Sequence, residues 1–347
     1  MRILHSADWH LDTPFTGHTG AALSFLKAQL LQLPDKVARL CREQNCDLLL
    51  LSGDLFDGAA SAEGVQALKR ALKEVAVPVF IAPGNHDFCS PDSPYLTEVW
   101  PENVHIFTRQ TIESIPLPAL NCRIYGAGYQ SMDCDPLLEN FRITGEEKYH
   151  IAVLHGDPTK VTSHYCPITQ AQIAASGLTY LALGHVHKSG SFTAGSTLCG
   201  WPGCPMGRGN DETGEKGVYL VDTDDMSLRF IPLDVPRFYD VEVSVTTTAE
   251  EAALSVLPPV GNNDFYRITL TGECVPFHIP SFPQFPNLTL RDHTTPPADL
   301  WSCIQTDTLE GNFFRLLHDS LENDAETATL AAQISRKILN GQEVALP

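Results

Sequence analysis

The sequence predicts a large α/β domain followed by a smaller domain of different character. Through the first two-thirds of the chain, short apolar runs of strand length alternate with longer runs of helical periodicity, a pattern typical of α/β folds. The chain has 347 residues, 43% of them hydrophobic, which is enough for one full-sized core and a second small one. The character changes after Val235-Pro236-Arg237, so we expect domains at residues 1–236 and 237–347.

The elements of the first domain follow from these runs in order. Helical periodicity extends over residues 21–44 with a break near Pro34, a residue suited to the first turn of a new helix. A second helix is expected over 61–74, because its apolar residues recur on one face. A meandering β region rich in glycine is expected over 191–222. Strands are expected at residues 2–6, 48–52, 79–82, 151–154, 180–183 and 227–231.

The second domain has a mixed pattern. A short helix at residues 249–256 separates two of its expected strands, and a proline-rich stretch at 276–286 precedes the third. The end of the chain, residues 309–339, is mostly helical in pattern. The strands are expected at 240–245, 266–271 and 288–291. These strand and helix patterns together predict a small α+β domain.

The composition points to a soluble, cytoplasmic protein. The longest apolar runs, such as Leu48 to Leu51, are far shorter than the roughly 20 residues that cross a bilayer, so no membrane association is expected. The N-terminal sequence becomes polar too early for a signal peptide. The ten cysteines are scattered and form no CxxC pair, which favours reduced thiols over a disulfide framework.

The net charge of −19 indicates how tightly the chain can bind a nucleic acid. Proteins that gain affinity by neutralising phosphates carry basic surfaces, and the composition as a whole lacks one. Bound divalent ions would add positive charge locally. We therefore expect this chain by itself to bind DNA only weakly.

Five short polar motifs each follow a predicted strand. In order they are Asp8-Trp9-His10, Gly53-Asp54-Leu55-Phe56-Asp57, Gly84-Asn85-His86-Asp87, His155-Gly156 and Gly184-His185-Val186-His187. Loops at the carboxyl ends of strands are where α/β proteins assemble sites from distant parts of the sequence. Carboxylates with neutral imidazoles suit divalent Mn, Fe or Zn. Any one motif alone is explained by a turn or a helix cap, but five in this order favour a metal site.

This set of motifs resembles the calcineurin-like metallophosphoesterase superfamily over most of residues 1–235. Two further segments are similar to SbcD-related DNA-repair exonucleases of the YhaO type: His10 to Phe15, and Pro202-Gly203-Cys204-Pro205-Met206-Gly207-Arg208 continuing to Val221. The resemblance implies a four-layer α/β/β/α sandwich with a small C-terminal α+β capping domain. It also implies two divalent metal ions per chain, with manganese the expected ion and iron, zinc or magnesium as alternatives.

The resemblance also implies roles for individual residues. One metal ion would be held by Asp8, His10 and His187, and the other by Asn85, His155 and His185. Asp54 would bridge the two ions. His86 would face the scissile phosphate, where it stabilises charge or protonates the leaving oxygen, and Asp87 would orient it.

Three further residues are candidates for substrate contact, and a few others are expected to pack. Asp57 ends its motif at a position where some of the repair nucleases carry histidine, and Arg208 and Lys216 lie in the specific segment. A solvated loop explains Arg208 and Lys216 equally well. Packing is the expected role of Trp9, Phe56 and Cys204.

The function that the resemblance implies is hydrolysis of DNA phosphodiesters, as an exonuclease with endonuclease activity as a further mode. It also implies a homodimer and a coiled-coil ATPase partner of the SbcC type. Two alternatives stay open. The first is a phosphodiesterase for nucleotides or other small phosphodiesters, which the acidic charge favours because small substrates need no basic surface. The second is a non-catalytic scaffold for an ATPase, which the complete set of polar motifs disfavours.

Overall fold

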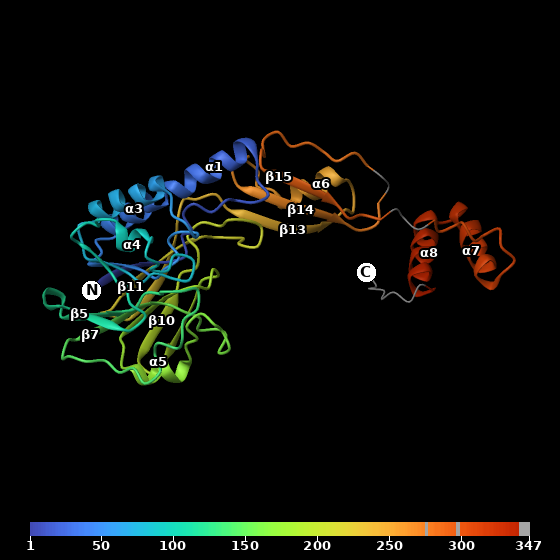
Figure 1. The fold of residues 1–347 in the computed structure, drawn as a ribbon. Helices are drawn as coiled ribbons and strands as arrows, with labels where there is room; N and C mark the ends of the chain where they lie inside the picture. The colour runs from blue at the N-terminus through green and yellow to red at the C-terminus, as the bar shows by residue number, and fades with distance from the viewer. Residues whose placement is uncertain (275–276, 296–298, 340–347) are drawn as a thin grey trace. The chain divides into compact units, whose positions relative to one another are not determined.

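The structure, a computed structural model, describes residues 1–274, 277–295 and 299–339 (Figure 1). The chain divides into two compact units, the first comprising Met1–Asp240 and Asn263–Tyr266 and the second Val241–Asn262 and Arg267–Pro347. The first unit thus continues past the expected boundary at residue 236. Parts of the expected second domain, residues 275–276, 296–298 and 340–347, lie outside the described residues, and the proline-rich stretch begins among them.

The first sheet has the strand order β12-β11-β1-β2-β3-β4. Its parallel part consists of β1 (Arg2–Ser6), β2 (Leu48–Leu51), β3 (Val79–Ile81) and β4 (Val104–Ile106). Two antiparallel strands extend it beyond β1, namely β11 (Gly217–Asp222) and β12 (Ser227–Pro232). The strands expected near the N-terminus and at residues 227–231 are confirmed, whereas β4 was not predicted.

The second sheet has the strand order β5-β6-β7-β8-β10-β9. Its parallel part consists of β6 (Cys122–Gly126), β7 (Tyr149–His155), β8 (Tyr180–Gly184) and β10 (Thr197–Trp201). The edge strands β5 (Glu113–Leu117) and β9 (Gly190–Ala194) pair in antiparallel fashion. The expected strands in β7 and β8 are confirmed. The expected β region over 191–222 is interrupted, because residues 202–216 form a loop.

Helices cover the outer face of each sheet. Figure 1 shows α1 (Gly20–Leu31) and α3 (Ala62–Val75) on one side of the first unit and α5 (Gln170–Ser176) on the other. The helical region over 21–44 does break near Pro34, which lies in the first turn of α2 (Leu33–Glu43). A short α4 (Pro94–Thr97) and a 3-10 turn at Pro118–Leu120 complete the helical elements of this unit among the described residues.

Alternate residues of the central strands face different layers. Leu4, Leu49 and Leu51 pack in the core beneath the first helical layer. Ile3, Leu48 and Leu50 instead pack against residues of the second sheet, including Ile124 and Val153. A third core lies on the other face of that sheet and includes Leu154, Leu181 and Ile173. Strands buried on both faces read as continuous apolar runs, which explains the four consecutive leucines of β2. The four-layer α/β/β/α sandwich is confirmed.

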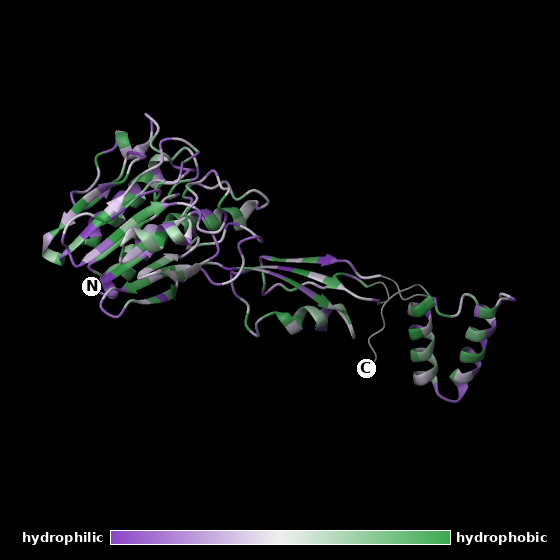
Figure 2. Cartoon of the chain, turned by 90° about the horizontal axis from the view of Figure 1, so that it is seen from below, coloured by the Kyte–Doolittle hydropathy of each residue, from purple (hydrophilic) through white to green (hydrophobic). Residues whose placement is uncertain are grey.

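The second unit contains a pair of helices and most of a small sheet, two of whose strands begin within the first unit, at Phe238–Asp240 and Phe265–Tyr266. The sheet has the order β13-β14-β15, formed by β13 (Phe238–Ser244), β14 (Phe265–Thr271) and β15 (Leu288–Asp292), and α6 (Ala249–Val256) connects the first two strands. The helices are α7 (Leu309–Asp319) and α8 (Ala325–Leu339), with a 3-10 turn at Ser320–Glu322 between them. The strands and helices expected here are confirmed. The hydropathy colouring of Figure 2 shows hydrophobic residues concentrated in the strands of the first unit.

None of the helices in the described part of the chain combines the length and the apolar character that crossing a bilayer demands. All ten cysteines lie within the described residues and are free thiols, as expected.

Candidate active site and metal centre

The predicted ligands lie in loops that follow strands of both sheets. The loops after β1, β2 and β3 carry Asp8 and His10, Asp54, and Asn85 respectively. His155 is the last residue of β7, and His185 and His187 follow β8. The structure brings these seven residues into one cluster, in which Asp8, His10, Asp54 and His155 are completely or almost completely buried.

The loops after β1 and β2 are held together by their backbones. The amides of Asp8, His10 and Leu11 donate to the carbonyls of Gly53, Asp54 and Leu55 at 3.0, 2.9 and 2.9 Å. Asp8, His10 and Asp54 have φ of 55°, 48° and 51°, in the left-handed region that residues with a Cβ rarely adopt. Such conformations persist only where the surrounding structure holds them, and they gather at functional sites. The hydrogen-bonded loops provide that support here.

The first predicted ligand set converges on one point. Ligand atoms of Asp8, His10 and His187 all lie within 4.8 Å of one another. The Nε2 atoms of His10 and His187 face each other at 3.1 Å. Among the described residues, Asp8 Oδ2 is a buried carboxylate oxygen without a hydrogen-bond partner. A buried carboxylate oxygen costs free energy when it is unpaired, so this donor set fits a divalent cation.

The second predicted set adjoins the first. Asn85 Oδ1 lies 2.9 Å from His155 Nε2 and 3.3 Å from His185 Nδ1. Asp54 Oδ2 is 3.3 Å from His155 Nε2, and Asp54 belongs to one group with His10 and to another with Asp8 and His155. Asp54 is therefore in the position that a bridging ligand needs. His155 Nδ1 donates to the carbonyl of Ser52 at 2.8 Å, which leaves Nε2 facing the cluster.

Glycine is required beside this cluster for steric reasons. A Cβ on Gly84 would lie 2.3 Å from Asp54 Oδ1 and 2.8 Å from the His155 ring. A Cβ on Gly53 would lie 2.7 Å from His155 Nδ1. These two positions therefore let the loops approach the ligands as closely as they do.

The electrostatics of the cluster favour positive charge at its centre. Burial by itself would raise the pKa of Asp54, but the neighbouring His155 and His10 hold it well below its usual range. Burial would likewise lower the pKa of His155, but the Asp54 and Asp8 carboxylates raise it to about 9. Burial and the nearby His155 lower the pKa of His185 to about 4, so this imidazole is neutral at pH 7. The carboxylates of the cluster thus favour positive charge between them, which is the charge that a divalent metal ion brings.

His86 lies at the edge of the cluster, and its partner is not the predicted one. Its side chain is 40% exposed, and its Nδ1 lies 3.0 Å from Asp57 Oδ1. This hydrogen bond raises the pKa of His86 despite the opposing effect of partial burial. The prediction that Asp87 orients His86 is wrong, because Asp57 does so. His86 also has a ring nitrogen within 4.8 Å of ligand atoms of His10 and Asp54.

Asp87 binds backbone amides instead. It accepts hydrogen bonds from the amides of Leu55 and Gly84, both at 2.7 Å, and more weakly from those of Asp54 and Phe56. The Tyr95 hydroxyl donates to it at 2.6 Å. The carboxyl of Asp87 thus joins the loops after β2 and β3, and it is fully occupied by these contacts beneath the site.

The other predicted substrate contacts have distinct surroundings. Asp57 lies between His86 and His10, whose Nδ1 is 3.6 Å from its carboxylate. Arg208 is paired with Glu212, with guanidinium to carboxylate distances of 2.6 and 3.2 Å. Lys216 is buried next to Gly207, whose Cβ would lie 3.5 Å from Lys216 Cε.

The three residues expected to pack do so. Trp9 and Phe56 are buried in the core beneath the first helical layer. Cys204 is also buried, and burial raises the pKa of its thiol to about 12. An inert, protonated thiol is consistent with packing.

Two further residues of the site were not predicted. Glu212 accepts a hydrogen bond from His187 Nδ1 at 2.7 Å, and Tyr95 anchors Asp87 as described above. Burial would raise the pKa of Glu212, but His187 and Arg208 hold it well below its usual range. Neither residue belongs to a motif of the ligand type. The only signal in the sequence was the position of Glu212 within the segment that resembles the repair nucleases.

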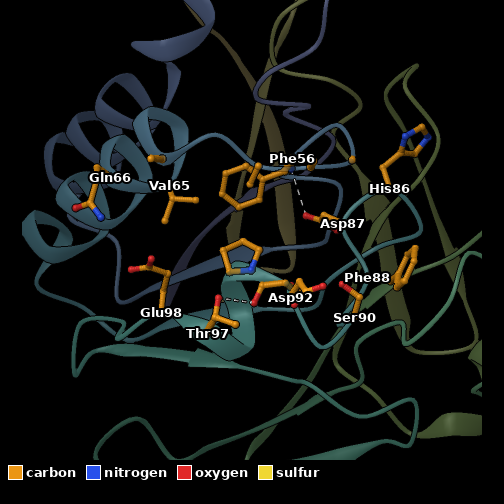
Figure 3. A pocket seen from close by; sticks show the side chains of 16 residues that line it. Phe56, Val65, Gln66, His86, Asp87, Phe88, Ser90, Asp92, Thr97 and Glu98 are labelled. Carbon is orange, nitrogen blue, oxygen red and sulfur yellow. Dashed lines mark hydrogen bonds between the residues drawn. The ribbon is translucent and has the colours of Figure 1, made fainter.

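A pocket of about 580 Å³ adjoins His86 (Figure 3). In Figure 3, His86 lies at one end of the pocket and Gln66 and Glu98 at the other. The small residues Gly58, Ala59 and Ala60 leave room along one wall, and Phe56 and Phe88 contribute aromatic surface. A substrate bound at the metal cluster therefore has space for a substituent next to His86.

Comparison with known proteins gives a consistent assignment. The family model of calcineurin-like phosphoesterases matches residues 1–189. The uncharacterized metallophosphoesterase YhaO of Bacillus subtilis (strain 168) is 30% identical over 293 residues, covering 79% of this chain and 70% of the relative. The SbcD subunit of the nuclease SbcCD from the same organism is 26% identical over 268 residues, covering 64% of this chain and 66% of the relative.

Two further similarities cover less of this chain or are lower in identity. The SbcD subunit of the nuclease SbcCD from Staphylococcus saprophyticus is 28% identical over 123 residues, covering 34% of this chain and 31% of the relative. The solved structure of TT1561 of Thermus thermophilus has a TM-score of 0.43 and 16% identity, covering 67% of this chain and 98% of that one.

The family match at residues 1–189 contains all seven predicted ligands together with His86. It also contains the four parallel-paired strands of the first sheet. The match and the geometry of the site thus coincide in one part of the molecule. The chain belongs to the calcineurin-like phosphoesterase family, whose members are metal-dependent phosphoester hydrolases.

Proposed function

We propose that the protein is a two-metal phosphodiester hydrolase that acts on DNA as an exonuclease, with endonuclease activity as a further mode. The observation that carries the proposal is the single cluster formed by the seven predicted ligands beside the half-exposed His86. Similarity to the SbcD subunit of the nuclease SbcCD supports DNA as the substrate. Manganese is the proposed ion, with iron, zinc or magnesium as alternatives.

The residues of the site have different roles in the proposed reaction. Two divalent ions, when bound, polarise the phosphate and activate water for attack. Asp54 lies near ligand atoms of both sets and would hold both ions, and Asn85 and the histidines would complete the two sets. His86 has its Nδ1 bonded to Asp57, so its Nε2 is the nitrogen available to stabilise charge on the phosphate or to protonate the leaving oxygen. Asp57 therefore acts by positioning His86.

The proposal of a DNA-binding partner rests on charge. A net charge of −19 opposes tight binding of a polyanion by this chain alone. We propose that an SbcC-like coiled-coil ATPase supplies basic DNA-binding surface, and that the chain works as a homodimer. Failure of this protein to bind any such ATPase, or to be stimulated by it, would contradict the proposal of a partner.

The experiment is manganese-dependent degradation of end-labelled linear duplex DNA. Wild type is compared with His86→Ala and Asp54→Asn, with His278→Ala in the second unit as a matched histidine control, since His278 is exposed there. We expect both site variants to lose DNA cleavage while remaining folded. His86→Ala should lower kcat by a factor of about 10²–10⁴. Wild-type protein that binds metal but cleaves no phosphodiester, with or without the ATPase, would contradict the function and favour a scaffold.

A second candidate is a phosphodiesterase for nucleotides or other small phosphodiesters. The acidic charge and the pocket of about 580 Å³ beside His86 favour it, because a small substituent fits that space and needs no basic surface. Hydrolysis of a chromogenic phosphodiester and of dinucleotides, with DNA left intact even when the ATPase is present, would select this function. The same His86 and Asp54 variants would then lose the small-substrate activity.

A further inference from the structure

The loop over residues 202–216 brings an acidic residue against a predicted metal ligand. Glu212 is 7% exposed, and its Oε1 lies 2.7 Å from His187 Nδ1. Arg208 Nη2 lies 2.6 Å from the same oxygen and 3.0 Å from the same nitrogen. The amide of Arg208 donates to the other carboxylate oxygen of Glu212 at 2.8 Å. Two charged groups, the Glu212 carboxylate and the Arg208 guanidinium, thus meet at His187 Nδ1, on the side of the ring away from His10.

The chemistry of these groups determines which nitrogen of His187 carries the proton. An ionised carboxylate paired with arginine only accepts hydrogen bonds. If Nδ1 were unprotonated, its lone pair would face the Glu212 oxygen at 2.7 Å, which is unfavourable. Arg208 Nη2 could donate to an unprotonated Nδ1 at 3.0 Å, but this contact is longer, and the same Nη2 already donates to Glu212 Oε1 at 2.6 Å. The shorter contact with Glu212 thus favours the proton on Nδ1, and Nε2 then presents its lone pair toward His10 Nε2, 3.1 Å away, and toward Asp8. A neutral imidazole with a free nitrogen is the form that binds a metal ion.

We propose that Glu212 is a positioning residue of the metal centre, which fixes the Nδ1–H tautomer and the orientation of His187 so that Nε2 is available to an ion. Carboxylates in this position tune metal affinity, typically by 10- to 100-fold. Arg208 has a separate role, since its guanidinium neutralises Glu212 and this pair helps to hold the loop in place. The proposal rests on the ligand role of His187 in the proposed function.

The first test is metal binding to the full chain, measured by calorimetric titration of metal-free protein with manganese. Wild type should bind two ions. Glu212→Gln should weaken one of the two sites by about 10- to 100-fold and leave the other unchanged. The control is Glu215→Gln, because Glu215 lies in the same loop but is 62% exposed and pairs with Arg237 at 3.5 Å. Glu215→Gln should bind both ions as wild type does.

A second variant separates positioning from mere support of the loop. Arg208→Met removes the guanidinium and keeps the carboxylate facing His187 Nδ1. We expect Arg208→Met to bind both ions within a few-fold of wild type. An equal loss of affinity in Arg208→Met and Glu212→Gln would overturn the proposal, because Glu212 would then act only through the loop.

The tautomer provides a readout that does not depend on metal. Nitrogen-15 NMR of metal-free protein, labelled at histidine and assigned with His187→Ala, reports which ring nitrogen is protonated. We expect the Nδ1–H form in wild type and a shift toward the Nε2–H form in Glu212→Gln, since an amide NH₂ can donate to Nδ1. An unchanged tautomer with unchanged affinity in folded Glu212→Gln would refute the role of Glu212. Wild-type protein that binds no metal would instead refute the proposed function.

Discussion

A single carboxylate beneath the site holds two of its loops together. Asp87 accepts hydrogen bonds from backbone amides that follow β2 and β3 and from the Tyr95 hydroxyl, and it is 6% exposed. Removing an acceptor of this kind leaves several buried donors without partners. Asp87 thus supports Asp54 and Asn85 by fixing their backbones, at a distance from the substrate.

Replacement of Asp87 should therefore cost stability as well as activity. We expect Asp87→Ala to lower the free energy of unfolding by about 3 kcal/mol or more, because amides of Leu55 and Gly84 and the Tyr95 hydroxyl all lose their acceptor. Urea denaturation of metal-free protein measures this change. Asp92→Ala is the control, as Asp92 is exposed in the same loop region. Stability equal to that of wild type would mean that Asp87 is not the support of these loops.

The site residues that could be predicted from the sequence are those whose residue type alone suggests metal binding. Asp8, His10 and Asp54 follow apolar strands in motifs that favour metal binding, and the structure brings them together. The contacts of Asp87 with the Leu55 amide and of Glu212 with His187 could not be predicted, because each joins segments that are distant in sequence. The motif Gly84-Asn85-His86-Asp87 does not itself show whether the Asp87 carboxylate contacts the His86 imidazole or backbone amides.

At the scale of elements, the site is a junction between loops of two sheets. Loops after β1, β2 and β3 supply ligands from the first sheet, while β7 and the loop after β8 supply them from the second. Bound ions would cross-link these loops and would be absent from the unfolded chain. Binding to the native state alone stabilises that state by mass action.

Metal removal should accordingly lower thermal stability. With manganese at about 100 times its Kd, each site contributes about 2.7 kcal/mol, which chelation by EDTA removes. We expect a lower melting temperature of wild type in EDTA and recovery when manganese is restored. Asp54→Asn, which weakens the central ligand of both sets, should show a much smaller difference between the two conditions. A melting temperature of wild type that does not respond to metal would contradict the metal centre.

The interface between the sheets contains a buried histidine that gives stability a pH dependence. His5 on β1 contacts Tyr180 of the second sheet at 2.7 Å through Nδ1 and Ser52 at 2.9 Å through Nε2. Burial lowers its pKa from 6.5 to about 3. The unfolded chain therefore gains a proton on His5 below about pH 6.5, whereas the folded chain does so only near pH 3. Stability is highest above pH 6.5 and falls as the pH decreases through this interval.

Substitution of His5 should reduce the pH dependence of the free energy of unfolding. Between about pH 7 and pH 5, we expect wild type to lose about 2 kcal/mol more of its unfolding free energy than His5→Gln does. Urea denaturation in EDTA at both pH values measures the difference. The comparison of slopes is independent of how much the substitution itself destabilises the protein. Equal slopes would show that His5 is not the titrating group.

The strands that the sequence did not predict have weak patterns. β4 and β5 contain only half-buried and exposed residues, so neither forms the continuous apolar run of β2 or β7. β6 begins with Cys122 and includes Arg123, which pairs with Glu147 at 2.8 Å. Their positions depend on pairing with neighbouring strands, which local sequence does not encode.

At the scale of the whole molecule, the first unit depends on residues beyond the boundary that composition suggests. Phe238 and Phe265 stack with ring centroids 4.8 Å apart and belong to its core. Both lie after residue 236. The change in composition at Pro236 therefore precedes the end of the structural unit, because composition does not record which later side chains return to an earlier core.

Truncation should distinguish these two boundaries. A chain that ends at residue 236 loses both phenylalanines, and loss of a buried phenylalanine side chain costs on the order of 3–5 kcal/mol. A chain that ends at residue 295 keeps them and lacks only α7 and α8 among the described helices and strands, together with the 3-10 turn between them. We expect the shorter chain to aggregate or melt at a much lower temperature, and the longer one to retain metal-dependent stability. Equal stability of the two would contradict the contribution of Phe238 and Phe265.

Because β1 pairs with β11, the first sheet cannot be completed until late in synthesis. β1 lies between β2 and β11 in its sheet, and the register joins Arg2 to Asp222. A ribosome makes β1 long before β11, so one edge of β1 has no partner until β11 has been translated. At about 5–20 residues per second, this delay is roughly 10–45 seconds. During that time the nascent chain exposes an apolar strand edge, so its yield in the cell should depend on chaperones that bind before translation is complete.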